Sequence, residues 1–283
     1  MGHHTRGVCP GKRQDKGVAR SGMGLVTFLS DFGCRSSYPA AMKGAAAAAG
    51  AVAFVDISHD VPRHDVRAGA YLLWSAVPAF PRGTVHCAVV DPGVGTARAA
   101  LVVAAGGQFL VGPDNGLLMP AARRLGAARV FRLIVPSYLR ARISSTFHGR
   151  DVFAPAAARL AAGAAIERLA RPVRDFVDLT FPVGRRRGRV LEGEIVWIDP
   201  FGNLITTIPG ALLAGMGSPR RVAVEVGTRT LDAAAVRTFA NVGRGHGLVF
   251  VGSDGVVEVA VNRGSAADAT GAVSGQPVRI RPV

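Results

Sequence analysis

The sequence predicts an α/β domain with a central sheet flanked by helices over residues 23–183, followed by a smaller all-β domain over residues 190–283. The length of 283 residues exceeds that of one average domain, which favours two. Apolar runs alternate with helical segments in the first part, as in a layered α/β sheet. After Pro182 the pattern changes to short strands separated by turn residues, which is typical of a β-barrel or a β-sandwich.

The first domain opens with a short apolar run at residues 25–29 that ends in the polar loop SDFG at residues 30–33, the pattern of a buried strand leading into a site. An Ala-rich segment at residues 38–49 stops at a glycine and predicts a helix. The further elements alternate in the same way: strands are expected at residues 51–57, 84–90, 99–104, 108–111 and 129–134, and helices at 66–77, 115–125 and 151–162.

The second domain is predicted to hold only strands, with no helix between them. An arginine run precedes it, which we interpret as an interdomain linker with its boundary at residues 183–191. Residues 1–22 are polar, basic and Gly-rich without the apolar segment of a secretory signal, so they are expected to form a disordered leader. The strands are expected at residues 193–198, 221–226, 228–231, 247–251, 256–261 and 278–280.

The formal charge of +15 suggests a nucleic-acid partner, but the distribution of the charge argues against it. Part of the excess lies in the leader and part in the arginine run, and the few aromatic residues do not interleave with basic ones as base-stacking surfaces require. We therefore expect no nucleic-acid partner; a basic nucleic-acid binder stays as an alternative that would show salt-dependent binding to any duplex.

Composition also bounds the compartment. No apolar stretch approaches the ~20 residues that span a bilayer, so no membrane association is expected. The cysteines Cys9, Cys34 and Cys87 are odd in number and form no CxxC pair, which argues against a disulfide framework and a structural zinc site. A reducing, cytoplasmic setting fits.

Polar residues follow the predicted strands where ligands bind in open α/β sheets, beyond the carboxyl ends. Asp31 follows the first strand, where a carboxylate can accept hydrogen bonds from a ribose diol or can cap the next turn. The segment DPGVGTAR at residues 91–98 has Arg98 at the third glycine of a GxGxxG loop and precedes a strand, which argues against a dinucleotide site. Asp91 and Arg98 can instead pair across the loop, which would hold Asp91 ionised.

The third cluster is FHGRD at residues 147–151, with His148 just before a predicted helix and Asp151 available as its N-cap. A lone loop histidine is more often a surface residue than a catalyst, but Gly149 beside it would let a substrate approach closely. In the β-rich part, DPFGN at residues 199–203 is either a plain turn or presents Asn203 to a heterocycle and Phe201 to a flat ligand. The GSDG turn at residues 252–255 has the same two interpretations.

Taken in order, the motifs SDFG, DPGVGTxR, GPDNGLL, FHGRDxFAP, DPFGN and GSDG resemble those of the S-adenosylmethionine (SAM) hydroxide adenosyltransferases, relatives of the SAM-dependent fluorinase and chlorinase. The resemblance runs from Met23 to Val283. It implies an α/β domain, a C-terminal β-barrel and a homotrimer in which the substrate lies between one subunit's α/β domain and the next subunit's barrel.

The resemblance also implies the reaction and its residues. Water would displace methionine from the ribose 5′-carbon of SAM and release adenosine, with no metal and with SAM as substrate rather than cofactor. The catalytic set falls on Asp91, Arg98 and His148, with water held in line by His148 and Arg98. The substrate-binding residues that it implies are Asp31 at the ribose, Asn203 at the adenine, Asp199 and Ser253 near the methionine and adenosine ends, and Phe201, Glu258 and Val261.

The distinction from the halogenases is visible in the same positions. Where those enzymes have Tyr and Thr in the halide pocket, this chain has Asp91 and Val94, and where they have Tyr-Ser it has His148 and Gly149. This favours hydrolysis over a SAM-dependent halogenase. Three residues depart from the family pattern, Ser36, His64 and Thr207. Ser36 and Thr207 motivate the other alternative, a non-catalytic SAM- or adenosine-binding protein.

Overall fold

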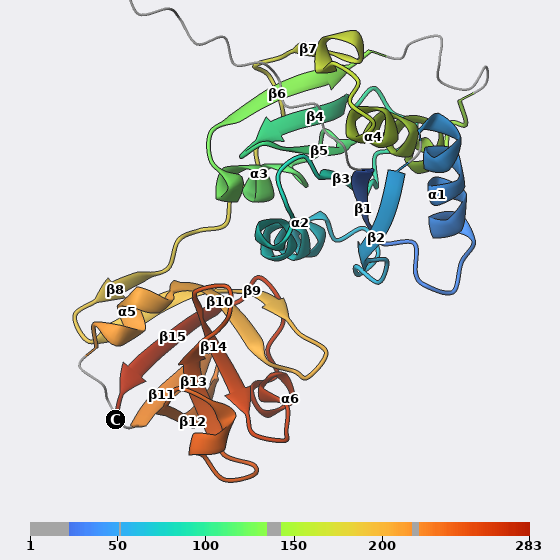
Figure 1. Ribbon diagram of the computed structural model, residues 1–283. Helices are drawn as coiled ribbons and strands as arrows, with labels where there is room; N and C mark the ends of the chain where they lie inside the picture. Colours follow the sequence, from blue (N-terminus) through green and yellow to red (C-terminus); the bar gives the residue numbers. More distant parts are fainter. Residues whose placement is uncertain (1–22, 51, 135–142, 217–220) are drawn as a thin grey trace, which may run out of the picture.

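The structure is a computed structural model that describes residues 23–50, 52–134, 143–216 and 221–283, so the predicted leader at residues 1–22 lies outside the described residues. Two domains follow one another along the chain, an α/β domain and a β-barrel, as Figure 1 shows. The predicted fold class is thereby confirmed for both halves. No helix within the described ranges is long and apolar enough to cross a membrane.

The α/β domain is built on a seven-stranded sheet in the order β2-β1-β3-β5-β4-β6-β7. Its first four strands pair in parallel and the remaining pairs are antiparallel. The strands are β1 (Gly24–Ser30), β2 (Val52–Ser58), β3 (Val85–Val89), β4 (Ala100–Ala105), β5 (Gln108–Pro113), β6 (Ala128–Leu133) and β7 (Ala170–Pro172).

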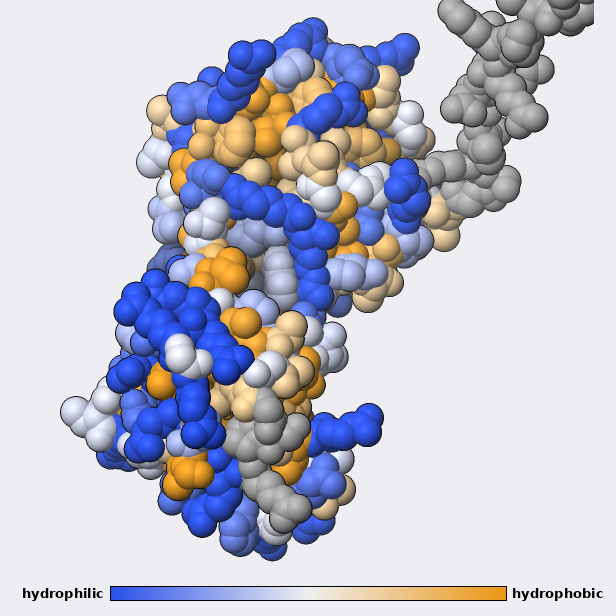
Figure 2. Space-filling model, turned by 90° about the vertical axis from the view of Figure 1, so that its left-hand side faces the viewer, coloured by the Kyte–Doolittle hydropathy of each residue, from blue (hydrophilic) through white to orange (hydrophobic). Residues whose placement is uncertain are grey.

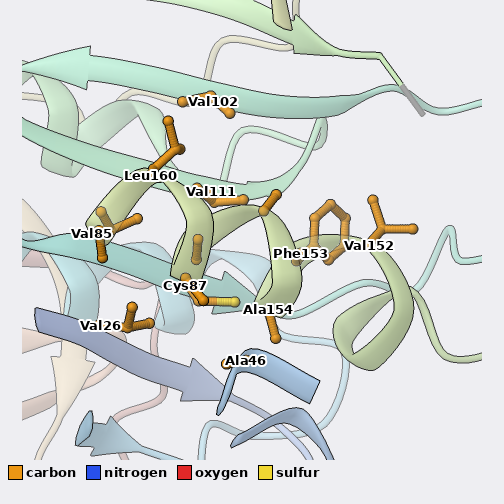
Figure 3. Packing of buried hydrophobic residues seen from close by; sticks show 14 of the residues in the cluster. Val26, Ala46, Val85, Cys87, Val102, Val111, Val152, Phe153, Ala154 and Leu160 are labelled. Carbon is orange, nitrogen blue, oxygen red and sulfur yellow. The ribbon is translucent and has the colours of Figure 1, made fainter. Parts of the chain in front are cut away.

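Helices cover both faces of this sheet. Helices α1 (Tyr38–Ala49) and α4 (Ala154–Ala161) pack on one face, and α2 (Val66–Ala76) and α3 (Met119–Leu125) pack on the other. The alternation along β1 explains this, since Val26 and Phe28 enter the first core and Leu29 enters the second. In the first core, sheet residues such as Val85 and Val111 lie against Phe153 and Leu160 (Figure 3).

The second domain is a closed barrel of seven strands in the cyclic order β9-β10-β14-β13-β12-β11-β15, because β10 pairs with β9 as well as with β14. An eighth strand, β8, adds to β9 outside the ring. The elements are β8 (Arg185–Arg187), β9 (Val190–Ile198), β10 (Leu204–Pro209), α5 (Gly210–Ala214), β11 (Arg221–Val226), β12 (Arg229–Ala235), β13 (Gly247–Val251), β14 (Val256–Val261), α6 (Ala266–Thr270) and β15 (Pro277–Pro282).

The arginine run is not a linker, as its composition suggested, but contains strand β8. Arg185 pairs with Glu192 in register on β9, and that glutamate also lies 3.2 Å from the Nε of Arg187 and 3.6 Å from that of Arg279. The single carboxylate of Glu192 thus pairs with a segment that was expected to be a linker. Figure 2 shows hydrophilic side chains gathered on this side of the barrel, close to the α/β domain.

Other local expectations were also wrong. The expected helix at residues 115–125 begins only at Met119, because the side chain of Asn115 instead accepts a hydrogen bond from the amide of Leu117 in a turn. The expected helix at residues 151–162 begins earlier, with a π-helical turn at Gly149–Phe153. The barrel contains a strand that was not expected, β10, and two short helices, α5 and α6.

A buried polar network ties three elements of the α/β domain together. His86 on β3 is fully buried, and its ring nitrogens lie 2.8 Å from the Thr27 hydroxyl and 2.7 Å from the Gln108 amide oxygen. Burial lowers the pKa of His86 from 6.5 to about 4, against the smaller opposing effect of Gln108. The folded protein therefore holds a neutral imidazole where the unfolded chain would already be protonated.

This network predicts an acid-dependent loss of stability. Between pH 6.5 and about 4, His86 is protonated in the unfolded chain but stays neutral in the folded chain. The free energy of unfolding should therefore fall by about 3 kcal/mol as the pH drops through this window. Above this window, His86 should not make the free energy of unfolding depend on pH. Urea titrations of wild type and His86→Gln should show a shallower acid slope in the variant, with exposed His246→Gln as the control; equal slopes would contradict the assignment.

Candidate active site

The three residues of the predicted catalytic set come together beside one cavity. Asp91 follows strand β3, Arg98 lies at the end of the loop that leads to β4, and His148 directly precedes the π-helical turn. A cavity of about 450 Å³ is lined by Asp91 and His148 together with Asp31, which follows β1. The further lining residues are Phe32, Ser36, Tyr38, Arg63, His64, Val89, Val94, Thr146, Phe147 and Gly149.

Asp91 and Arg98 form a two-bond ion pair at this cavity. The Nε of Arg98 donates to Oδ1 of Asp91 at 2.9 Å, and its Nη2 donates to Oδ2. Their side chains are only 6% and 11% exposed, and the guanidinium also lies 5.1 Å from the centroid of the Phe153 ring. Removing either partner would leave its counterpart without a partner in a poorly solvated place, so each residue fixes the position of the other.

Arg98 also determines the state of His148. Its Nη2 lies 2.7 Å from Nδ1 of the imidazole, and since a guanidinium can only donate, Nδ1 must accept. The neutral ring then carries its proton on Nε2. Burial and, next, the charge of Arg98 lower the pKa of His148 from its ordinary value, against the opposing charges of Asp91 and Asp151. Near neutral pH, His148 is therefore an uncharged hydrogen-bond donor through Nε2.

A buried carboxylate supports the loop that carries His148. Asp151 was expected to cap a helix, but it lies inside the π-helical turn with a fully buried side chain. Its Oδ2 accepts from the amide of Ser144 at 2.9 Å, and Arg150 donates to both of its oxygens. π-Helical turns are frequent at functional sites, and this one anchors the segment that ends at His148.

Gly149 has a packing role in addition to the expected close approach of a substrate. A Cβ atom at this position would lie 3.1 Å from Sδ of Met42, 3.4 Å from the Phe147 ring and 3.5 Å from the Phe32 ring. A side chain there would press on residues of the core and of the cavity wall at once.

Asp31, predicted to bind the ribose, lines the cavity, and its side chain is 8% exposed. Its Oδ2 accepts from the backbone amide of His64 at 2.9 Å. His64 has a φ of +64°, an uncommon conformation for a residue with a side chain, and its imidazole is 74% exposed. His64, one of the three departures from the family pattern, thus lines the cavity beside Asp31.

The barrel has a separate cavity of about 550 Å³ that contains four of the predicted binding residues. Asp199 accepts from the amides of Phe201 and Asn203 at 2.9 Å each and from Nδ2 of Asn203 at 2.8 Å, so its carboxylate shapes its own turn. Phe201 is 78% exposed and presents its ring to solvent. The lining residues are Asp199, Phe201, Asn203, Phe239, Val261, Arg263 and Gly264.

Sequence reasoning missed two of these residues. Phe239 offers an aromatic ring and Arg263 the one charge of opposite sign to Asp199 among the lining residues. Arg263 has a φ of +56°, which no motif signalled. Ser253 and Glu258, in contrast, do not line this cavity: Ser253 is exposed on the turn before β14. Burial, with the nearby charges of Asp199 and Asp254, raises the pKa of Glu258 to about 7.

The departures from the family pattern fall in different places. Ser36 lines the α/β cavity, where its hydroxyl donates to the Phe32 carbonyl at 3.0 Å. Thr207 lines a third cavity of about 620 Å³ between the domains, beside Trp74 and Phe181, and its hydroxyl accepts from the amide of Glu194. Within the described residues no cluster of three or more potential metal ligands occurs.

Family models and named relatives match this chain over both of its domains. The models of the SAM hydroxide adenosyltransferase N-terminal and C-terminal domains match residues 26–170 and 193–279. A protein of Salinispora tropica named (R)-S-adenosyl-L-methionine hydrolase is 43% identical over 90% of this chain and 97% of its own length. A protein of the same name from Thermus thermophilus is 44% identical over 90% and 98%. A fluorinase of an Actinoplanes species is more distant, 28% identical over 86% and 92%.

Solved structures agree as well. An uncharacterized conserved protein from Thermotoga maritima aligns with a TM-score of 0.86 and 33% identity over 90% of this chain and 99% of its own. A conserved hypothetical protein of Thermus thermophilus aligns with a TM-score of 0.73 and 43% identity over 91% and 100%. An α/β domain followed by a closed barrel, matched in this order, defines the class that includes these hydrolases and fluorinases. Within it, the chain belongs to the SAM hydroxide adenosyltransferase family.

The contact between Arg98 and His148 predicts how the imidazole titrates. In wild type, NMR titration of the His148 ring should give a pKa below 6.5, because burial and the guanidinium both disfavour the imidazolium. Arg98→Met should raise that pKa, since it removes the positive charge and keeps much of the side-chain volume. An unchanged or lower pKa in Arg98→Met would show that the guanidinium does not control this ring; His148→Gln assigns the resonance.

Proposed function

We propose that the protein hydrolyses SAM to adenosine and methionine, with Asp91, Arg98 and His148 as its catalytic residues. The observation that carries this is the chain of hydrogen bonds from Asp91 through Arg98 to His148 at a cavity that Asp31 also lines. The names of the relatives specify SAM hydrolases, and the matched domains cover both cavities. No cofactor beyond the substrate is needed for this chemistry.

The difficult part of this reaction is the activation of the nucleophile, water. The bond between C5′ and sulfur breaks with its electron pair going to sulfur, so methionine leaves as a neutral thioether without protonation. The new bond joins C5′ to a water oxygen, whose proton must be lost. Forming free hydroxide at pH 7 costs about 12 kcal/mol, so groups that stabilise negative charge on that oxygen accelerate the reaction.

The contacts at the site favour charge stabilisation over general-base catalysis. Nδ1 of His148 is occupied by Arg98, and both oxygens of Asp91 are occupied by the same guanidinium. The neutral imidazole therefore offers an N–H and Arg98 offers its positive charge, which suits a hydroxide or a water losing its proton to solvent. Asp91 orients Arg98, and the barrel supplies substrate-binding residues rather than chemistry.

The most direct test follows the oxygen atom. Incubated with SAM in ¹⁸O-water, the protein should yield adenosine labelled at the 5′-hydroxyl with stoichiometric methionine. His148→Ala should lose at least about 10²-fold in kcat, because it removes a donor aimed at the attacking oxygen, whereas exposed His246→Ala should be unaffected. Tight SAM binding without product would instead identify a binding protein, and a 5′-halogenated nucleoside formed with added halide would identify a halogenase.

We further propose that the active unit is a homotrimer in which the barrel of one subunit completes the α/β cavity of the next. Support comes from the two cavities, which share no lining residue within one chain. Asp31 and the catalytic triad of Asp91, Arg98 and His148 lie at the α/β cavity. The turn that contains Asn203 lies at the barrel cavity. In the proposed trimer, a nucleoside held by both sets joins two chains.

This assembly predicts complementation between two inactive variants. His148→Ala damages only the α/β cavity and Asn203→Ala only the barrel cavity, so each alone should be nearly inactive. Co-expressed in equal amounts, they should recover about one quarter of wild-type activity, because one interface in four pairs two intact halves. No recovery in verified mixed trimers would show that the site is built within one chain.

A further inference from the structure

One motif remains unexplained by the site. The GSDG turn at residues 252–255 joins β13 to β14 and was predicted to touch the substrate, yet none of its residues lines the triad cavity or the Asn203 cavity. Gly255 instead lines the cavity between the two domains. The side chain of Asp254 points out of the barrel and contacts the α/β domain of its own chain.

The carboxylate of Asp254 accepts hydrogen bonds from three donors on two helices. Its Oδ2 accepts from the Tyr71 hydroxyl at 3.1 Å and from the Ser75 hydroxyl at 2.7 Å, both on α2. Its Oδ1 accepts from Nη2 of Arg124 on α3 at 3.2 Å. The carboxylate is 15% exposed, so these bonds compete little with water.

The donors are themselves held in place. The guanidinium of Arg124 lies 3.7 Å from the centroid of the Trp74 ring, a cation–π contact that fixes its plane. Burial and, next, the charge of Asp254 raise the pKa of Tyr71 above its usual range, so the hydroxyl keeps its proton and its donor role. Residues 71 and 75 are one helical turn apart, which places both hydroxyls on the same face of α2.

The same face of α2 makes a second attachment to the barrel. Arg67, one turn before Tyr71, forms an ion pair with Glu194 on β9. The ring of Tyr71 also stacks on Trp197 of β9, with 6.4 Å between centroids and 23° between planes. Helix α2 lies at the end of the α/β domain that faces the barrel (Figure 1). Two separate attachments, at β9 and at the GSDG turn, fix an angle that one attachment would leave free.

We propose that Asp254 is a positioning residue that sets the orientation of the barrel, and with it the direction in which the Asn203 cavity faces a neighbouring subunit. The proposal rests on the proposed function, with its shared site. Asp254 reaches no reacting atom. Its loss should therefore weaken substrate binding and leave the chemistry of the Asp91 triad nearly intact, because interactions lost equally from ground and transition states raise KM and not kcat.

The test compares Asp254→Asn with Asp232→Asn, a matched change at a carboxylate that is 71% exposed on β12. The amide would turn an N–H toward a ring of donors, so we expect KM for SAM to rise about tenfold and kcat to change by less than about threefold. Asp254→Glu, which keeps the charge, should recover part of the loss. Asp232→Asn should match wild type.

Two further variants keep the proposal falsifiable if Asp254→Asn folds poorly. Tyr71→Phe removes one donor and should raise KM about threefold. Arg124→Gln and Tyr71→Phe combined should raise KM by less than the product of the single effects, because both act on one carboxylate. Unchanged KM in these variants, or an equal loss of kcat, would overturn the proposal. Wild-type protein inactive on SAM would instead overturn the proposed function itself.

Discussion

The ion pair between Asp91 and Arg98 is the constraint on which the rest of the site depends. A carboxylate and a guanidinium this poorly solvated cannot be separated without leaving a buried charge, so the pair holds together the two ends of the loop between β3 and β4. Arg98 then has one remaining direction for Nη2, toward Nδ1 of His148. The ion pair thereby orients Arg98, whose contact with Nδ1 determines the imidazole tautomer and adds to the effect of burial in lowering the pKa of His148.

The fold brings these residues together by connecting separate elements at one edge of the sheet. β1 and β3 are parallel neighbours, so Asp31 and Asp91 emerge at the same end. His148 arrives from a segment some fifty positions away and is held by the buried Asp151 inside the π-helical turn. The site lies directly against the core, where Phe153 packs among the buried residues and contacts the Arg98 guanidinium.

Much of the fold and of the candidate site could be predicted wherever hydrophobic periodicity or a charged motif indicated it. The strand at residues 221–226 and the helix at residues 38–49 coincide with the observed elements, and Asp91, Arg98 and His148 do meet. Two of the failures have a common physical cause, contacts with residues of another element. The arginines of β8 form a strand because Glu192 lies opposite them, and Asp254 faces Tyr71 rather than a ligand. Glu192 lies on the next strand and Tyr71 lies far back in the chain, and composition alone indicates neither contact.

The closure of the barrel has a consequence for the behaviour of the protein at high concentration. Because β10 pairs with both β9 and β14, the ring leaves no unpaired strand within it, and β8 is attached to β9 alone. A strand with a free edge can template pairing with another chain and start aggregation. Here that edge is short and carries three consecutive exposed arginines, whose mutual repulsion between molecules opposes such pairing and favours a dispersed protein.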